Sequence, residues 1–294
     1  MRRSEAATRF VLAPTLGLGM FAVGCGFETA DDSETARVEV THAVVVVERS
    51  AGADELDAVK AEAFAGFLNF SAELEPNAVL PIAGLSLELP AIGACKNLDD
   101  DATAVAPEGL VRAELLDAGE VTLVAGGVVT TLAPRAFPNA ADGISGVVYT
   151  TRDRAAEPLP AASRYTVATS GSAALDPISV ELPAPAALSA VTLMGIPLSD
   201  GATVQVARAL DLRWNAGAPG DIVYATLETD DTSTICTFRD DSGHGTLPAT
   251  ALPRAGSASL TVHRLRATPF SSVGLVGRGE LRFDFEISGS VTVE

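Results

Sequence analysis

Short runs of apolar residues, many of them β-branched and alternating with polar residues, recur along most of the chain. In the first half these runs cover 38–40, 43–47, 85–89, 120–124, 128–132, 146–151 and 164–168. Clusters of Gly, Pro, Asn and Asp separate them. Alternation with a period of two is typical of strands with one buried face, and short strands at regular spacing are typical of sandwiches and barrels. The pattern therefore predicts an all-β protein.

The stretch 55–74 is ambiguous because two periodicities overlap in it. Phe64, Phe67 and Leu68 have the spacing of one helix face, whereas Phe64, Leu68 and Phe70 lie an even number of residues apart, as on one face of a strand. We predict a strand here, in agreement with the rest of the chain.

Further runs with strand character fill the second half of the chain. They cover 191–194, 204–206, 209–214, 222–228, 234–238, 258–265 and 280–293. Before them, Pro183 and Pro185 favour extended backbone and mark a boundary. About seven strands in ~110 residues is the size of one sandwich domain. The sequence thus predicts two β-sandwich domains in tandem, residues 38–182 and 188–294, joined by a linker at 183–187.

Residues 209–224 carry a family resemblance. The run ALDLRW at 209–214 is followed by a GAPG turn at 217–220 and by DIVY at 221–224. This order resembles the early strands of fibronectin-type-III and related immunoglobulin-like modules, in which a tryptophan packs between two sheets. The resemblance implies an immunoglobulin-like sandwich for residues 188–294.

Trp214, the only tryptophan, ends an alternating run. Leu210 and Leu212 share its face of the predicted strand, whereas Asp211 and Arg213 lie on the opposite face. Because its own face is the apolar one, we predict that Trp214 lies in the core.

The first residues have the layout of an export signal. Arg2 and Arg3 form a basic start, and the apolar stretch 10–24 is shorter than the ~20 residues that a membrane-spanning helix needs. We therefore expect a cleaved signal peptide at residues 1–24.

The segment Ala22-Val23-Gly24-Cys25 resembles the lipobox of bacterial lipoproteins. The resemblance implies that Cys25 becomes the lipid-modified first residue, and Gly26 after it points to the outer membrane. Residues 25–37 are polar and acidic, as expected of a tether to the folded part. The alternative is ordinary secretion with an unmodified Cys25.

The chain is strongly acidic, with 20 Lys and Arg against 38 Asp and Glu and a net charge of −18. This charge disfavours nucleic acid and anionic lipid surfaces as partners. Acids cluster in predicted loops at Asp99, Asp100 and Asp101, at Asp230 and Asp231, and at Asp240 and Asp241. Calcium prefers several oxygen ligands from such loops, so the first and third clusters are calcium candidates. Alternatively, the acids keep loops solvated and block edge-to-edge strand pairing.

Cys95 and Cys236 remain if Cys25 is acylated, and an exported protein permits disulfides. A bond would have to join the two predicted domains, with Cα atoms within ~7 Å of each other. Two separately buried thiols are the alternative.

Catalytic motifs do not stand out in the sequence. It contains no Gly-x-Ser-x-Gly elbow, Ser-x-x-Lys motif, phosphate-binding glycine loop or EF-hand loop. His42 and His263 fall in strand-like runs, and we expect them to be ordinary surface or packed residues. His244 lies in the glycine-containing sequence DDSGHG, which is typical of a turn.

We therefore expect a non-enzymatic binding or structural module on the outer membrane, without a cofactor unless calcium binds. An envelope protein or a polysaccharide would be its partner. The alternative is a carboxylate-based hydrolase or carbohydrate-active protein with a cleft between the two domains.

Overall fold

The computed structural model describes residues 39–52, 60–73, 79–81, 85–98, 113–137, 144–152, 159–205, 209–229, 232–251 and 256–294. Within these ranges its elements are strands and short 3₁₀ helices, which confirms the all-β prediction. The strands are β1 (Glu39–Gly52), β2 (Lys60–Ser71), β3 (Cys95–Asn97), β4 (Ala113–Leu115), β5 (Val121–Ala125), β6 (Val128–Phe137), β7 (Ile144–Thr150), β8 (Arg164–Thr169), β9 (Ser179–Pro183), β10 (Thr192–Leu193), β11 (Ile196–Pro197), β12 (Ala202–Val204), β13 (Leu210–Arg213), β14 (Ile222–Glu228), β15 (Ser233–Arg239), β16 (His244–Leu247), β17 (Gly256–Phe270) and β18 (Gly277–Val293). The 3₁₀ helices are η2 (Leu198–Asp200), η3 (Asp240–Ser242) and η4 (Ala249–Ala251). In the described part of the chain, no helix has the length and apolar character needed to cross a membrane.

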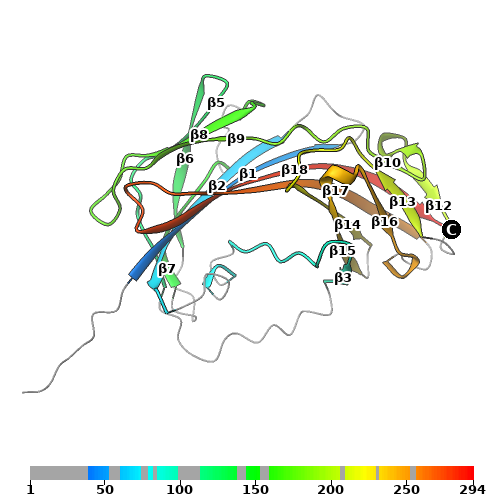
Figure 1. The fold of residues 1–294 in the computed structure, drawn as a ribbon, viewed down its shortest axis with the longest axis horizontal. Coiled ribbons are helices and arrows are strands. Elements are labelled where there is room, and N and C mark those ends of the chain that lie inside the picture. The colour runs from blue at the N-terminus through cyan, green and yellow to red at the C-terminus, as the bar shows by residue number, and fades with distance from the viewer. Residues whose placement is uncertain are drawn as a thin grey trace, which may run out of the picture. The chain divides into compact units, whose positions relative to one another are not determined.

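One large sheet connects strands from both halves of the sequence. Its order is β3-β15-β14-β17-β18-β1-β2-β4-β7-β6-β5-β8-β9, and β12 also pairs with β18. A second sheet has the order β11-β10-β13-β16. Figure 1 shows β1, β2, β17 and β18 running alongside one another through the large sheet. Two sandwiches in tandem, divided at 183–187, are therefore not confirmed, and residues 37–294 form one compact unit.

A long parallel pairing of β1 with β18 joins the two halves, and in it Val45 lies opposite Leu281. The residues of β1 explain this central position. Val44, Val45 and Val47 are all buried, although successive side chains point to opposite faces. A strand that is covered on both faces carries a continuous apolar run, and the valine run of β1 has this form.

Two hydrophobic cores share strand β18. Its residues Leu281, Phe283 and Phe285 belong to one core together with strands β5 and β8. Further along the same strand, Ile287 and Val291 belong to a second core, together with β13 and β14. The 17-residue length of β18 thus lets one alternating strand bury side chains in both cores.

Strand predictions hold for most runs but fail for 85–89. Residues 60–71 form β2, as predicted for the ambiguous stretch. Residues 85–89 belong to no sheet ladder. Their alternation has another cause: Leu85, Leu87 and Leu89 pack against side chains of the large sheet. An alternating pattern therefore marks an extended segment with one buried face, whether or not it pairs with a strand.

Candidate functional site

Residues 85–98, which we call the strap, cross one face of the large sheet. At the start, Leu85 packs where Gly66 of β2 has no side chain, since a Cβ there would lie 2.9 Å from Leu85 Cδ1. Next, Leu87 and Leu89 pack with Tyr224 and Ile235 of β14 and β15, among others. At its end the strap becomes strand β3 and pairs with β15. The strap therefore covers the strands between β2 and β15.

Cys95 and Cys236 form a disulfide at this last pairing, with Cα atoms 4.0 Å apart. The two cysteines are opposite each other in the β3–β15 register. The bond joins residues 141 positions apart in sequence and fixes the end of the strap to the sheet. Sequence reasoning left this pairing open because it placed the two cysteines in separate domains.

Under the strap lies a group of polar side chains that we call the acid–histidine–tyrosine cluster: Tyr224, His263, Asp284 and Glu286. The Nδ1 atom of His263 lies 3.0 Å from Oδ1 of Asp284 and 3.4 Å from Oε2 of Glu286. Its ring stacks on Tyr224, with centroids 4.1 Å apart. The Tyr224 hydroxyl donates a hydrogen bond to Oδ2 of Asp284.

Strand register brings these residues together. His263 lies opposite Tyr224 on one side and opposite Glu286 on the other, so the three side chains share one face of the sheet. Asp284 is two residues from Glu286 on β18 and therefore points the same way. The cluster is thus built on three neighbouring strands, which is a rigid support for a site.

Burial controls the charges of this cluster. It raises the pKa of Glu286, and the neighbouring acids Asp284, Glu48 and Glu228 raise it further, whereas His263 opposes the shift. Burial also raises the pKa of Tyr224, as do the charge and the hydrogen bond of Asp284. Tyr224 therefore keeps its proton and stays a donor to Asp284.

Beside the cluster, the strap and the sheet enclose a cavity of about 200 Å³, which we call the strap pocket. Its walls combine apolar side chains with charges of both signs. They consist of Val46, Glu48, Phe64, Leu85, Ser86, Leu87, Arg152, Arg282 and Asp284. Asp284 is the residue that belongs to both the cluster and the pocket.

Ion pairs hold the charged walls of the strap pocket. Arg152 lies 2.8 Å from Glu48 and 2.6 Å from Glu62, and the hydrogen bonds to these two acids raise the pKa of Arg152. Arg282 lies 2.6 Å from Glu280 and donates a hydrogen bond of 3.2 Å to the carbonyl oxygen of Leu85. Arg282 therefore connects the strap to the sheet, and the pocket can offer both acceptors and donors to a bound molecule.

A second, more open groove of about 450 Å³ lies further along the same strands. Hydroxyl side chains dominate its walls, which consist of Glu228, Thr229, Ser257, Ala258, Ser259, Ser288, Gly289 and Ser290. Ser288 is two residues beyond Glu286 on β18, so the groove continues the polar face that begins at the strap pocket.

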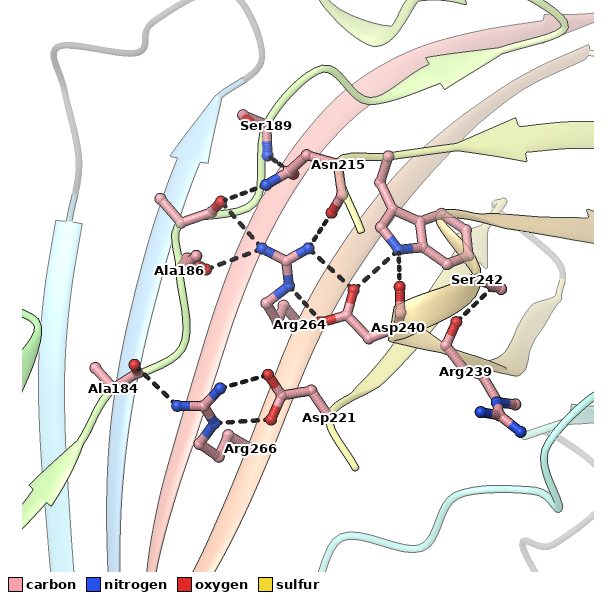
Figure 2. A network of polar contacts seen from close by, with 12 residues as sticks. Ala184, Ala186, Ser189, Asn215, Asp221, Arg239, Asp240, Ser242, Arg264 and Arg266 are labelled. Carbon is pink, nitrogen blue, oxygen red and sulfur yellow. Dashed lines mark hydrogen bonds and ion pairs between the residues drawn. The ribbon is translucent and has the colours of Figure 1, made fainter. Parts of the chain in front are cut away.

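A different polar network, with a fully buried ion pair at its centre, lies on the opposite face of β17 (Figure 2). Arg264 and Asp240 are both 0% exposed, and Nε of Arg264 lies 2.7 Å from Oδ2 of Asp240. The Trp214 indole donates hydrogen bonds of 3.1 and 2.9 Å to the carbonyl oxygen and Oδ1 of Asp240. Trp214 is 5% exposed, as its alternation predicts.

The two arginines of this network also fix the segment that sequence reasoning treats as a linker. Arg264 donates to the carbonyl oxygens of Ala186 and Ala187, at 3.0 and 3.1 Å. Arg266 binds Asp221 and donates to the carbonyl oxygen of Ala184, as Figure 2 shows. Residues 183–187 are thus held in place, and the network has a structural role.

Of the calcium candidates, the structure describes Asp240 and Asp241, and an arginine binds each of them. Asp240 belongs to the buried pair with Arg264, and Asp241 is bound to Arg239 at 2.6 Å. Asp99, Asp100 and Asp101 lie outside the described residues, as do Asp230, Asp231 and Cys25. Among the residues that the structure describes, no group of three or more His, Cys, Asp or Glu side chains could hold a metal ion.

His244 lies in the turn that its sequence predicts. The Ser242 hydroxyl donates to backbone oxygens of this turn, Arg239 at 2.6 Å or His244 at 2.7 Å, and Gly243 has a φ of 66°. Because the hydroxyl is bound to the backbone, Ser242 and His244 do not form a nucleophile–base pair. His42 is elsewhere, on β1, where burial lowers its pKa.

The cluster residues Tyr224, Asp284 and Glu286 were not singled out from the sequence, and His263 was interpreted as an ordinary residue. One signal was available: in β18, charged residues occupy every second position from Glu280 to Glu286, between buried apolar residues. An unbroken series of charges on one face of a long central strand indicates a polar site on that face.

No protein-family model matches the chain. A search of curated proteins also found no match.

Proposed function

We propose that the chain is an exported protein, anchored in the outer membrane by a lipid on Cys25, that binds a small ligand in the strap pocket without catalysing a reaction. The observation that carries the proposal is the composition of the pocket: two carboxylates, two guanidinium groups and an apolar wall surround about 200 Å³. Binding sites combine apolar walls with a few placed polar groups in this way.

The same composition suggests the chemical class of the ligand. Glu48 and Asp284 can accept hydrogen bonds from an ammonium group, and Arg152 and Arg282 can donate to a carboxylate. Phe64, Leu85 and Leu87 are among the apolar residues that would contact a hydrocarbon group. A zwitterionic molecule with an apolar side chain, such as an amino acid or a short peptide, fits this arrangement.

Binding is favoured over catalysis because the charged groups are already held by protein partners. Asp284 accepts from Tyr224 and His263, and Arg152 is bound by two glutamates. A nucleophile needs an adjacent base that activates it, and the two acids of the pocket already bind other side chains: Glu48 binds Arg152, and Asp284 binds Tyr224 and His263.

Leucine and its single-charge analogues test the pocket. We expect leucine to raise the unfolding midpoint of the wild-type protein more than leucine amide or 4-methylpentanoate does. Asp284→Asn should remove this effect, whereas Glu120→Gln, an exposed acid away from the pocket, should leave it unchanged. Equal effects of all three compounds, or an unchanged response of Asp284→Asn, would contradict the proposal.

Metabolic labelling with palmitate tests the anchor separately. The lipobox resemblance supports it, and several acyl chains at ~0.8 kcal/mol per buried methylene give a stable attachment. Cys25→Ala should abolish labelling, and persistent labelling would contradict lipidation of Cys25.

A carboxylate-based hydrolase is a second candidate, and one observation favours it. Glu48 lies opposite Asp284 in the β1–β18 register, and both line the strap pocket. Neighbouring strands are ~4.8 Å apart, near the ~5 Å separation of carboxyl groups in retaining glycosidases. Turnover of a nitrophenyl glycoside by the wild type, lost in both Glu48→Gln and Asp284→Asn, would favour this candidate over binding alone.

An immunoglobulin-like architecture for residues 188–294 is also kept as a proposal. Its support is the position of Trp214, which follows β13 of the small sheet and packs with Phe238 of the large sheet, with ring centroids 5.9 Å apart.

A further inference from the structure

The loop between β17 and β18, residues 271–276, exposes apolar side chains. Val273 is 105% exposed and Val276 is 71% exposed. The loop sequence SSVGLV contains no charged residue, although the chain as a whole carries a net charge of −18. We call residues 271–276 the apolar tip. Folding does not explain its two valines, because neither is buried.

The backbone of the apolar tip is fixed. The Leu275 amide donates to Ser272 O at 3.0 Å, and Leu275 itself is buried. A Cβ on Gly274 would lie 2.6 Å from the carbonyl oxygen of Pro177, so the loop packs closely against that residue. The valines therefore project from an ordered loop, and docking them requires little further ordering of the chain.

The apolar tip lies beside the start of β1. The Thr41 amide donates to the carbonyl oxygen of Val276 at 2.7 Å, and Thr41 pairs with Gly277. In Figure 1 the hairpin of β17 and β18 reaches the same end of the sheet as the first residues of β1. β1 begins at Glu39, and the chain from Cys25 to Glu39 can span at most ~50 Å. The anchoring cysteine is thus tethered to the end of the sheet that carries the tip.

We infer that the apolar tip docks on the bilayer surface to which Cys25 is anchored, with Val273 and Val276 entering the interface of zwitterionic phospholipids. The inference rests on the proposed lipid anchor. Zwitterionic lipid is the fitting surface because the strongly acidic chain is repelled by anionic lipid. Docking at this end leaves the strap pocket, which lies between β1, β2 and β18 further along the strands, open to a ligand.

Tryptophan substitutions at two exposed valines test the inference in the full-length acylated protein. Val273→Trp is the test variant. Val129→Trp is the matched control, because Val129 is also an exposed valine, 63% exposed, on β6 next to a hairpin turn. Each protein is reconstituted in phosphatidylcholine vesicles with and without brominated acyl chains, and the buried Trp214 emission of the parent protein is subtracted.

Val273→Trp should show blue-shifted emission that the brominated lipid quenches, and Val129→Trp should show neither effect. Equal quenching of the two, or none, in protein that carries palmitate would overturn the inference and leave the anchor intact. Absence of palmitate in the wild type would overturn both. A dimer in solution that Val273→Asp dissociates, without lipid quenching, would assign the tip to a second copy of the chain and also overturn the inference.

Discussion

His263 and Arg264 are consecutive residues of β17, yet they lie in polar networks with different properties. Because successive side chains of a strand point to opposite faces, Arg264 forms the buried ion pair with Asp240, and His263 faces the strap. Arg264 is 0% exposed, and its donors bind carboxylate and backbone oxygens. His263 instead contacts Asp284, a wall residue of a cavity.

The difference shows how a structural network is distinguished from a candidate site. Both contain acids, a positively charged or aromatic partner and short hydrogen bonds. The Arg264 network holds the backbone carbonyls of Ala186 and Ala187, so its loss would destabilise the fold. The acid–histidine–tyrosine cluster has a neighbouring cavity, so changes there should alter binding or pH response more than folding.

The largest effect is expected from Arg264→Met. The substitution leaves Asp240 buried without its cation, which typically costs about 3–5 kcal/mol of unfolding free energy. Urea denaturation measures the loss. Combining it with Asp240→Leu should restore part of the stability, because no charge is then buried alone. Arg266→Met is the control and should have a smaller effect, since the Arg266 side chain is 18% exposed. A loss for Arg264→Met as small as that of Arg266→Met would mean that the buried pair with Asp240 contributes little to the stability of the fold.

Cys95→Ser/Cys236→Ser should destabilise the protein by about 2–4 kcal/mol, because the bond closes a long loop in the unfolded chain. The strap should also loosen at its β3 end, which hydrogen exchange of residues 85–98 would detect. Unchanged exchange in the strap, together with unchanged stability, would show that the packing of Leu87 and Leu89 fixes the strap without the bond.

Trp214→Phe should lower the unfolding free energy by about 1–3 kcal/mol. An aromatic ring still occupies the site, but Asp240 loses the indole N–H donor. Thermal unfolding measures this loss. In the Arg264→Met background the two effects should not add, since both act on Asp240. Additive losses would place Trp214 outside the Arg264 network.

The contrast also explains what the sequence could predict. Alternation identified the strands and the buried face of Trp214, since it reports which face of an extended segment is covered. It does not report what covers that face. For Leu85, Leu87 and Leu89, the covering partner is the large sheet. Alternation also does not report which strands pair: β1 pairs with β18, more than 200 residues away in sequence. The predicted boundary at 183–187 failed to separate two sandwiches for this reason.

The candidate site could not be predicted from the sequence for the same reason. Tyr224, His263 and Glu286 come from three strands, and their meeting depends on a register that no local pattern specifies. Of the acid clusters that stand out in the sequence, the structure describes Asp240 and Asp241, and neither belongs to the candidate site. Asp240 forms an ion pair because Arg264, 24 residues later, returns to it across the core.

The smallest effect, and the one most specific to the acid–histidine–tyrosine cluster, is expected from Glu286→Gln. Burial raises the pKa of Glu286 in the folded state above its value in the unfolded chain. Between these two values the folded state binds more protons than the unfolded state, so the wild-type protein loses stability as the pH rises through this window. Glutamine cannot ionise. The variant should therefore match the wild type below the unfolded pKa of ~4.3 and exceed it in stability at neutral pH. Urea midpoints from pH 3.5 to 8 measure the difference, with the exposed Glu120→Gln as control. A variant that is less stable than the wild type at neutral pH would mean that ionised Glu286 is stabilised by His263 more than burial penalises it, and the cluster would then resemble the Arg264 network.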